Sequence, residues 1–528
     1  MTKEQYRLQN KDLRTRIENM RIARQISEDS LNLEKKGLEK KLRSKDKLIR
    51  TLQSYIAARE EAYNQVVEEN NALKKKCTGL SKECESFTDA VNMLTARINR
   101  NSSNSSKPPS TNGLKKVVHN SRKPSDRKPG GQPGHSGHGL SLPKKLMDLI
   151  ESGKANVEVV EHGKANGEYV SKYELDIQTA TVIREHRFYK DVPIPDGLRN
   201  PVNYGPNMKA LCVDLSMEGL VSAKRVSEFI DAISGGVVKP SKASVLAFQD
   251  EMSGLLDEEL DAIRESVINS PVLHVDETPV KSTQRPADNH VMEEARGTSF
   301  NLCVRTYSTG NSVFLTVNPH KDIAGVMADY VLSQYTGTAI HDHDLKYYNF
   351  KACRQGECNA HIIRYLIGME ELTKHGWTAK MIGLLLEMQE HKKKDMENQI
   401  FSMNAQALQE YSDRYDEILS MGKAEARTLS EKSLIRKDEI NLLSRMEKYK
   451  KSHLLFAYDY TVPFTNNEAE RSFRWIKTQQ KVSGCHRSYH GVEVSVRLMS
   501  FLLTLRKRQI SVFEAMKNLL NHHPVLAG

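Results

Sequence analysis

Cysteine is scarce in this chain of 528 residues, and long apolar runs are absent. Seven cysteines, an odd number spread thinly along the sequence, argue against a disulfide framework and are typical of a reducing compartment. No run approaches the roughly 18–20 apolar residues of a membrane-spanning helix. The first residues, MTKEQYRLQNKDLRTR, lack the apolar stretch of a secretory signal. The sequence therefore excludes secreted, membrane-spanning and disulfide-stabilised proteins, and we expect a cytoplasmic location.

Length and charge indicate the number of domains and the kind of partner. A chain of this length is too long for one ordinary domain and suggests three or four. Lys and Arg number 78 against 67 Asp and Glu, which gives a net charge of +11. This balance is compatible with a polyanionic partner but does not identify one.

The first hundred residues carry an apolar heptad repeat. One row of positions recurs every seven residues from Leu31, and a second row, four residues further along, recurs from Leu42. Two such rows without proline predict a coiled coil over residues 1–100. The alternative is a solvated helix that packs on its own chain. We expect a homo-oligomer, because a lone helix would leave this apolar seam in water. The seam is interrupted by the polar residues Lys45, Arg59 and Asn70, of the kind that can set register and oligomer number.

Residues 101–145 change abruptly to a Pro/Gly/Ser-rich composition that cannot build a core. We predict an extended basic linker that contacts the DNA phosphate backbone, although an inert tether has the same composition. The positive residues between 101 and 130 are Lys107, Lys115, Lys116, Arg122, Lys123, Arg127 and Lys128.

Two small modules are expected next. Residues 146–200 include an alternating, β-branched stretch at 156–195 that predicts a small β module. Residues 201–265 read as helices with a Gly-Gly turn, which is compatible with a helix-turn-helix DNA-binding region and equally with a plain helical bundle. In the first case Lys239 and Lys242 would lie near the DNA groove.

The remaining chain predicts a multidomain α/β protein with an interrupted core. Residues 266–364 read as three strands, a helix and a fourth strand, the order of an RNase H-like core. Residues 365–458 are long amphipathic helices, which we interpret as a helical insertion. Residues 459–528 would complete the core with a basic helix and the C-terminal helices.

Three carboxylates are the candidate catalytic residues. Asp276 lies within the strand-like VLHVDETPV, Asp342 ends the apolar GTAIHD, and Glu470 lies in the helical NNEAERSFRW. An acid on a buried strand is costly unless it is neutralised, and Mg²⁺ prefers carboxylate oxygens. Each acid alone has a simpler explanation: a strand-end aspartate often serves as a turn or cap residue, and Glu470 could pair with Arg474. Their order along the chain favours a joint metal site.

Four stretches together resemble one family. They are NSSKPPS followed by RKPGGQPGHSGHGL; VDETP; HDHDLKYYNF followed by ECNAHIIRYL; and NNEAERSFRWIKTQQKVSGCHRS. In this order they resemble bacterial transposases of insertion-sequence family sixty-six, which are DDE enzymes with an RNase H-like core. The resemblance implies that Asp276, Asp342 and Glu470 bind two Mg²⁺ ions, for which Mn²⁺ may substitute.

Two of these assignments have close competitors. Asp344 lies two residues after Asp342, and Glu468 two residues before Glu470. Asp342 is preferred because it ends the apolar strand and precedes Tyr347 by five residues, as the aspartate of the family does. Glu470 is preferred because it directly precedes Arg471, which matches the Glu-Arg pair of the family.

Zinc is not expected. The resembled family often carries a cysteine-rich module before its core, whereas residues 156–195 contain no cysteine. Cys358 and His361 form a CxxH pair, which alone is a weak zinc signal. We expect His361 to contact a phosphate or a hydroxyl near the carboxylates and Cys358 to pack in the core.

A basic stripe follows Glu470 at helical spacing. It is formed by Arg471, Arg474, Lys477 and Lys481. A solvated surface is the simpler explanation, but beside a metal site we expect these residues to contact phosphates. Trp475 could stack on an unpaired end base.

The resemblance implies a DNA transposase in the bacterial cytoplasm, associated with the nucleoid. Such an enzyme hydrolyses a phosphodiester at the element end, and the released 3′ hydroxyl attacks target DNA without a covalent protein–DNA bond. Its partners would be double-stranded DNA, further copies of the chain and small accessory proteins of the element. The alternatives are a domesticated, catalytically inactive DNA-binding protein and a coiled-coil scaffold, of which the scaffold leaves the three acids unexplained.

Overall fold

The computed structural model divides the chain into two compact units, residues 1–92 and 93–528. The residues it describes are 20, 63–101, 104–105, 144–153, 157–160, 162, 177, 179–189, 191–286, 292–295, 299–431 and 433–526. All seven basic linker residues expected to contact DNA, from Lys107 to Lys128, lie outside these ranges. None of the described helices is long and apolar enough to cross a membrane.

Helix α2 (Tyr63–Asn99) is continuous over 37 residues, as the heptad repeat predicts for this part of the chain. Its apolar rows face solvent: Leu73 and Leu94 are 57% and 56% exposed. The cysteines of the second row, Cys77 and Cys84, are exposed as well. Self-association through this surface stays a prediction.

The small β module predicted at 156–195 is wrong for the residues described there, because none of them lies in a strand. Their β-branched side chains are in water: Val159 is 78% and Ile183 86% exposed. The described residues of this stretch therefore form no sheet face that could be buried, and no core holds them in a β-ladder. Helix α3 (Lys144–Glu151) precedes this stretch, and a short 3-10 turn, η2 (Asp196–Leu198), follows it.

Residues 201–265 are helical as expected. The helices are α4 (Pro206–Met217), α5 (Ala223–Ile233), α6 (Lys242–Gly254) and α7 (Asp257–Ile268). Helices α5 and α6 start at Ser222 and Ser241, whose side chains accept the backbone N–H three residues on. The turn between them contains Gly235 and Gly236 with φ of 65° and 82°, a conformation that glycine adopts without strain.

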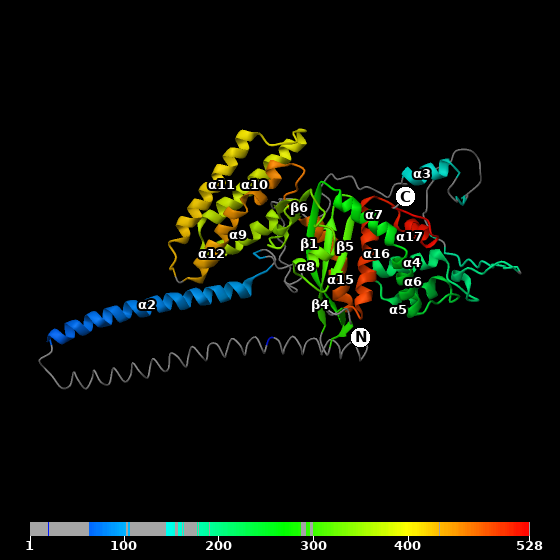
Figure 1. Cartoon of the computed structure of the whole chain (residues 1–528), viewed down its shortest axis with the longest axis horizontal. Helices are drawn as coiled ribbons and strands as arrows, with labels where there is room; N and C mark the ends of the chain where they lie inside the picture. Colours follow the sequence, from blue (N-terminus) through cyan, green and yellow to red (C-terminus); the bar gives the residue numbers. More distant parts are fainter. Residues whose placement is uncertain are drawn as a thin grey trace, which may run out of the picture. The chain divides into compact units, whose positions relative to one another are not determined.

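A five-stranded sheet lies at the centre of the second unit (Figure 1). Its strands are β1 (Val272–Ser282), β4 (Phe300–Ser308), β5 (Val313–Asn318), β6 (Thr338–His341) and β7 (Arg354–Glu357), in the order β5-β4-β1-β6-β7. The first three form an antiparallel meander, and β6 and β7 run parallel to β1. Helix α8 (Ile323–Ala328) lies between β5 and β6 in the chain, so the predicted order of three strands, a helix and a fourth strand is confirmed.

Two features of this region were not predicted. Strand β7 is a short edge strand of sequence RQGE, which has too few residues and too little apolar alternation to be recognised. A two-stranded ribbon, β2 (Gln284–Pro286) with β3 (Met292–Glu294), extends from the end of β1.

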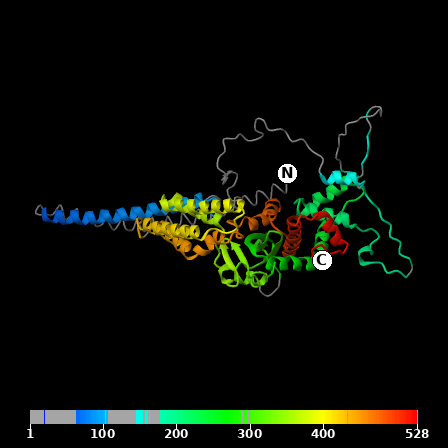
Figure 2. The ribbon, with the colours of Figure 1, turned by 90° about the horizontal axis from the view of Figure 1, so that it is seen from above.

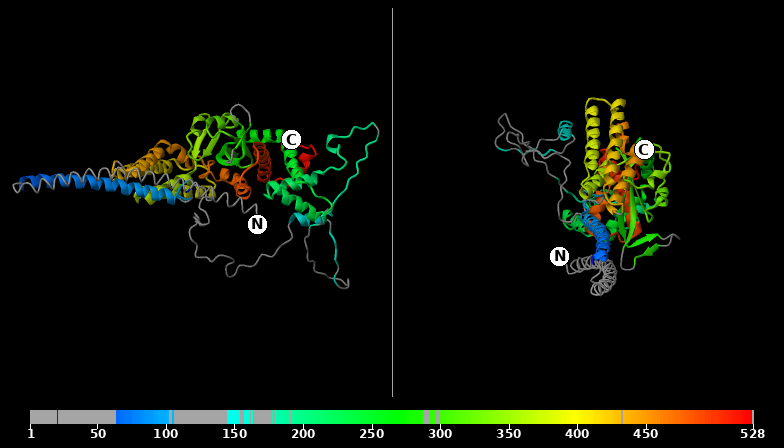
Figure 3. Two further views of the ribbon diagram at one scale, coloured as in Figure 1. Left: turned by 90° about the horizontal axis from the view of Figure 1, so that it is seen from below. Right: turned by 90° about the vertical axis from the view of Figure 1, so that its left-hand side faces the viewer.

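The predicted helical insertion consists of α9 (Asn359–Thr373), α10 (Gly376–Glu397), α11 (Ala405–Ala426), α12 (Leu434–Lys448) and α13 (Lys450–Tyr458). Figure 3 shows α10 and α11 running alongside each other. Their core is built around Trp377, Tyr415 and Phe456, and it reaches the sheet at Ile340 of β6. The helices start at 359, slightly before the boundary predicted at 365.

The C-terminal helices are α14 (Asn467–Ser472), α15 (Arg474–Ser483), α16 (Tyr489–Lys507) and α17 (Val512–Leu520). The segment expected as one basic helix is divided at Phe473. Helix α16 covers edge strand β5, whose Val313 and Leu315 N–H groups donate to Thr504 and Ser500 at 3.0 and 2.9 Å. Figure 2 shows α16 beside α4–α7, with which it shares one hydrophobic core.

Candidate active site

Asp276 lies on β1, and Asp342 directly follows the adjacent parallel strand β6, which ends at His341. The ladder between β1 and β6 pairs Val272 with Thr338 and ends at the pair His274–Ile340. The same register, continued by two residues, places Asp276 opposite Asp342. Both acids therefore lie just beyond the last pair, where the strands are no longer tied to each other.

Glu470 reaches this region because the start of α14 is anchored to β1. Asn466 is fully buried and donates its Nδ2 to the carbonyl of Val275 at 2.9 Å. Its Oδ1 lies 2.9 Å from Nδ1 of His274, and its backbone N–H donates to Cys358 Sγ at 3.1 Å. These contacts hold the first turn of α14 against the residues that flank Asp276.

The charges of the other two acids act on Asp276. Burial raises the pKa of Asp276, and the nearby negative charges of Asp342 and Glu470 raise it further. A hydrogen bond from the backbone N–H of Glu277 and the positive charge of Lys477 act in the opposite direction, and the resulting pKa is about 8. Lys477 therefore does not offset the cost of holding a negative charge on Asp276 beside the other two acids.

The two competing acids have other partners. Asp344 accepts from the ammonium group of Lys346 at 2.8 Å. Burial raises the pKa of Asp344, but hydrogen bonds from Lys346 outweigh it and lower the pKa overall. Glu468 lies 2.6 Å from Lys507, which likewise lowers its pKa against the effect of burial. Each of these acids is paired with a lysine, whereas Asp342 and Glu470 are half-buried and have no lysine or arginine ion pair among the described residues, which favours them as members of the site.

His361 faces Asp342. Its Nδ1 lies 2.9 Å from Asp342 Oδ1, without the angles of a hydrogen bond, and its Nε2 accepts from Arg364 at 2.9 Å. Burial lowers the pKa of His361, but the neighbouring Asp342 and Cys358 outweigh it and raise the pKa to about 11. Because Arg364 can only donate, Nε2 accepts and the ring proton is assigned to Nδ1. The ring is only 5% exposed, so its placement favours a contact with Asp342 over the predicted contact with phosphate.

Two donor sets at this site are candidates for a cation. Asp342, Cys358 and His361 have one ligand atom each within 4.8 Å of one another. In this set, however, Nδ1 of His361 carries a proton and Sγ of Cys358 accepts the Asn466 amide. The carboxylates of Asp276, Asp342 and Glu470 are better suited to Mg²⁺, which prefers oxygen ligands. The buried Oδ1 of Asp342 makes no hydrogen bond among the described residues, as expected of an atom with a free lone pair.

The basic residues near the acids lie at different depths. Arg471, Arg474 and Lys481 are exposed, whereas Lys477 is half-buried and close enough to Asp276 to lower its pKa. Trp475 is only 8% exposed and packs in the core shared with α16, so the predicted stacking on a base is wrong.

The two lysines expected at the DNA groove lie on the surface of the 201–265 region. Lys239 is paired with Asp231 at 2.6 Å, and its side chain is 60% exposed. Lys242 is the first residue of α6 and is also exposed.

Residues 202–494 match the model of the Transposase IS66 family, and this match covers more than half of the chain. The chain belongs to this family. Residues 3–141 match a second model, a family of unknown function (DUF6444). No curated protein matches the chain.

One solved structure is similar to part of this IS66-family transposase. The Drosophila P element transposase strand transfer complex matches with a TM-score of 0.28 and 10% sequence identity. The match covers 60% of this chain and 94% of that chain. The similarity is too low for an element-by-element comparison of the two structures.

Sequence reasoning missed several residues that shape the site. Asn466 was visible in the NNEAER motif, and its position just before the helix that carries Glu470 was the available signal. Glu277 and Lys346 were also overlooked. Each is a charged neighbour in the VDETP and HDHDLKYYNF motifs, but their contact joins segments 69 residues apart, so no local pattern reveals it.

Proposed function

We propose that this IS66-family chain is a DDE transposase that cleaves the ends of its element and transfers them into target DNA. We interpret the sheet, with its order β5-β4-β1-β6-β7, as an RNase H-like core. The observation that carries the proposal is the convergence of three acids from distant parts of the chain: the β1–β6 register leads Asp276 and Asp342 to the same end of the ladder, Asn466 ties the helix of Glu470 to Val275, and both other acids raise the pKa of Asp276. A buried acidic cluster drawn from three separate segments is typical of a functional site.

In the proposed reaction Asp276, Asp342 and Glu470 would hold two Mg²⁺ ions, with Mn²⁺ as a substitute. When bound, such ions would supply charge to activate the attacking oxygen and to stabilise the leaving oxygen of the phosphodiester. The protein's own contribution is to hold three carboxylates toward one point and to keep other protons away from them. The first attack would use water and the second the 3′ hydroxyl of the cleaved end, so no serine or tyrosine nucleophile is required.

Double-stranded DNA is the proposed substrate and partner. The exposed Arg471, Arg474 and Lys481 follow Glu470 on α14 and α15 and would contact phosphates beside the scissile bond. The exposed Lys239 and Lys242 belong to a helix–turn–helix arrangement that would bind the element ends farther from the cut. The linker lysines and arginines would add contacts that do not depend on sequence.

The apolar rows of α2 would bring two or more copies of the chain together, and paired copies would hold the two ends of one element. This part of the proposal rests on the exposure of Leu73, Cys77, Leu80 and Cys84 on one continuous helix. Accessory proteins of the element are further possible partners of such an assembly.

The test is cleavage of labelled DNA from the region flanking the gene, with and without Mg²⁺. Wild-type protein should release a 3′ hydroxyl and join it to a second DNA, whereas Asp276→Ala should bind the DNA and do neither. Asp261→Ala is the matched control, because Asp261 is an exposed acid on α7 with a 67% exposed side chain. DNA binding without cleavage by the wild-type protein would support the alternative, an inactive DNA-binding relative. Strand transfer by Asp276→Ala in Mg²⁺ or Mn²⁺ would contradict the proposed role of the acid.

A further inference from the structure

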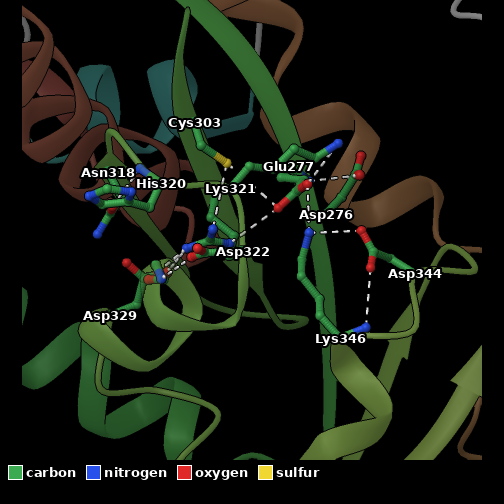
Figure 4. Close-up of polar contacts among 12 residues, drawn as sticks. Asp276, Glu277, Cys303, Asn318, His320, Lys321, Asp322, Asp329, Asp344 and Lys346 are labelled. Atoms are coloured by element: carbon green, nitrogen blue, oxygen red, sulfur yellow. Dashed lines mark hydrogen bonds and ion pairs between the residues drawn. The ribbon is translucent and has the colours of Figure 1, made fainter. Parts of the chain in front are cut away.

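A lysine outside the acidic triad bridges the two segments that carry the aspartates. The ammonium group of Lys346 lies 2.8 Å from Glu277 Oε1 and 2.8 Å from Asp344 Oδ2. Glu277 directly follows Asp276, and Asp344 lies two residues after Asp342. Figure 4 shows Lys346 between these two acids. The lysine side chain is only 10% exposed, so water screens the two ion pairs weakly.

The bridge spans the place where the sheet no longer holds the strands together. The β1–β6 ladder ends at His274 and Ile340, two residues before the aspartates. Beyond this point β1 is still paired with β4, which fixes Glu277 opposite Arg305. Strand β6 has ended, and its chain turns away through residues 342–346. Among the described residues, Lys346 supplies the ionic link between this turn and β1.

Glu277 is itself a firm anchor for the bridge. Its other oxygen, Oε2, lies 3.5 Å from Nε of Arg305, which is fully buried. Arg305 is held in turn by Asp329 and by the carbonyl of Gly325 at 3.1 Å. Through its contact with Glu277, Lys346 therefore fixes the turn that carries Asp344 against a rigid part of the sheet.

From this arrangement we infer that Lys346 is a positioning residue: its bridge sets the separation of Asp276 and Asp342 and thereby the affinity of the site for divalent cations. The inference rests on the proposed function, because it assumes that the two aspartates bind a cation jointly. Lys346 does not touch the reacting atoms. Loss of such outer contacts in metal sites typically weakens metal binding by about 10–100-fold.

Lys321 provides a matched control. Its ammonium group lies 3.1 Å from the same oxygen of Glu277, but its side chain is 74% exposed. Lys321 makes no ion pair with Asp344 among the described residues, and its charge only adds to that of Lys346 in lowering the pKa of Asp344. Lys321→Met therefore removes a charge of the same kind next to the same acid and leaves the bridge in place.

The experiment measures Mn²⁺ binding to the full-length protein without DNA, from the loss of the electron paramagnetic resonance signal of free Mn²⁺. Lys346→Met should weaken Mn²⁺ binding about tenfold, and Lys321→Met should bind within about twofold of wild type. In the cleavage assay, Lys346→Met should need more Mg²⁺ for half-maximal rate and recover most of the rate at saturating Mg²⁺. Glu277→Gln, which removes the β1 end of the bridge, should shift both quantities in the same direction.

The outcomes separate the inference from the proposed function. If the wild-type protein neither binds Mn²⁺ nor cleaves DNA, the proposed function fails. If the wild-type protein does both and Lys346→Met binds Mn²⁺ as tightly, the inference about Lys346 is wrong. Thermal unfolding shows whether Lys346→Met is folded, and if it is not, Glu277→Gln decides. Wild-type Mn²⁺ affinity in folded Glu277→Gln would then overturn the inference.

Discussion

The side chain of Asn466 donates a 2.9 Å hydrogen bond to the backbone carbonyl of Val275, the residue before Asp276. This bond joins the helix that carries Glu470 to the strand that carries the first aspartate. Asn466 is fully buried, its side chain also contacts His274, and its backbone N–H donates to Cys358, so one residue joins three segments of the site. The arrangement gives the first asparagine of the NNEAER motif a physical role.

Asn466→Ala should destabilise the protein by about 2–3 kcal/mol, because it leaves a buried carbonyl and a buried imidazole without a partner. It should also slow cleavage more than it weakens DNA binding, since Glu470 loses its anchor. Asn467→Ala is the control, because Asn467 is the next residue and is exposed. Urea unfolding of both variants measures the difference. Equal unfolding free energies for the two variants would show that the buried contacts do not hold α14 in place.

The sequence predicted the core strands well, and physical reasons explain where it did not. The apolar alternation of VLHVDETPV and the run GTAIHD identify β1 and β6, because strands of this kind are buried in a sheet. Alternation at 156–195 has the same appearance, yet Val159 and Ile183 remain exposed, since a strand also needs a partner and a core. Apolar alternation indicates which side chains can lie on the same face of a strand. It does not indicate whether another part of the protein covers that face.

Side-chain roles within the site were harder to predict for a related reason. His361 was expected at phosphate, but the fold buries its ring against Asp342. Trp475 was expected at a base, but its helix turns it into the core shared with α16. Both outcomes depend on how α9 and α15 rotate about their axes when they pack on the sheet, and this rotation is set by contacts with distant residues.

Glu357 should make the protein sensitive to acid. The carboxylate is buried and contacts His343, Tyr348, Arg445 and His453 at 2.6–3.2 Å. Burial raises the pKa of Glu357, but hydrogen bonds from the two histidines and the charge of Arg445 outweigh it and hold the pKa far below its usual range. A lowered folded-state pKa means that this carboxylate stabilises the fold above its unfolded pKa near 4.5 and that the contribution is lost as the pH falls below that value.

Glu357→Gln tests this dependence. At pH 7 the variant should unfold more easily by about 3–5 kcal/mol, because Arg445 keeps its charge and loses its buried partner. The difference in unfolding free energy between wild type and variant should become smaller as the pH falls below about 4.5. Glu390→Gln on α10 is the control for an acid outside this cluster. If the difference in unfolding free energy stays constant from pH 7 to pH 3, the ionised state of Glu357 is not the source of that difference.

Lys481→Met should weaken DNA binding without abolishing cleavage. The side chain is exposed at the end of α15, one helical turn after Lys477. Removal of one phosphate contact should reduce the slope of log affinity against log salt by about 1. At saturating DNA the cleavage rate should stay close to that of wild type. Binding titrations at several salt concentrations provide the measurement, and an unchanged slope would exclude a phosphate contact by Lys481.

The exposed cysteines of α2 offer a direct test of self-association. Cys77 and Cys84 belong to one heptad row, so in a parallel, in-register pair of helices each would face its counterpart. Mild oxidation should then give a product of twice the chain mass on a non-reducing gel. Cys77→Ser combined with Cys84→Ser should abolish this product, whereas Cys212→Ser, at a buried position in the second unit, should not. A monomer in light scattering, together with no cross-link, would contradict the predicted coiled coil.

Shared binding of divalent cations by Asp276, Asp342 and Glu470 is tested most directly by a Mn²⁺ titration of wild-type protein beside Asp276→Ala, Asp342→Ala and Glu470→Ala. Each of the three substitutions should remove or strongly weaken the same binding, because the carboxylates act on one site. Glu468→Ala should retain it, since Glu468 is paired with Lys507. Wild-type Mn²⁺ affinity in any one of the three variants would show that its carboxylate does not belong to the site.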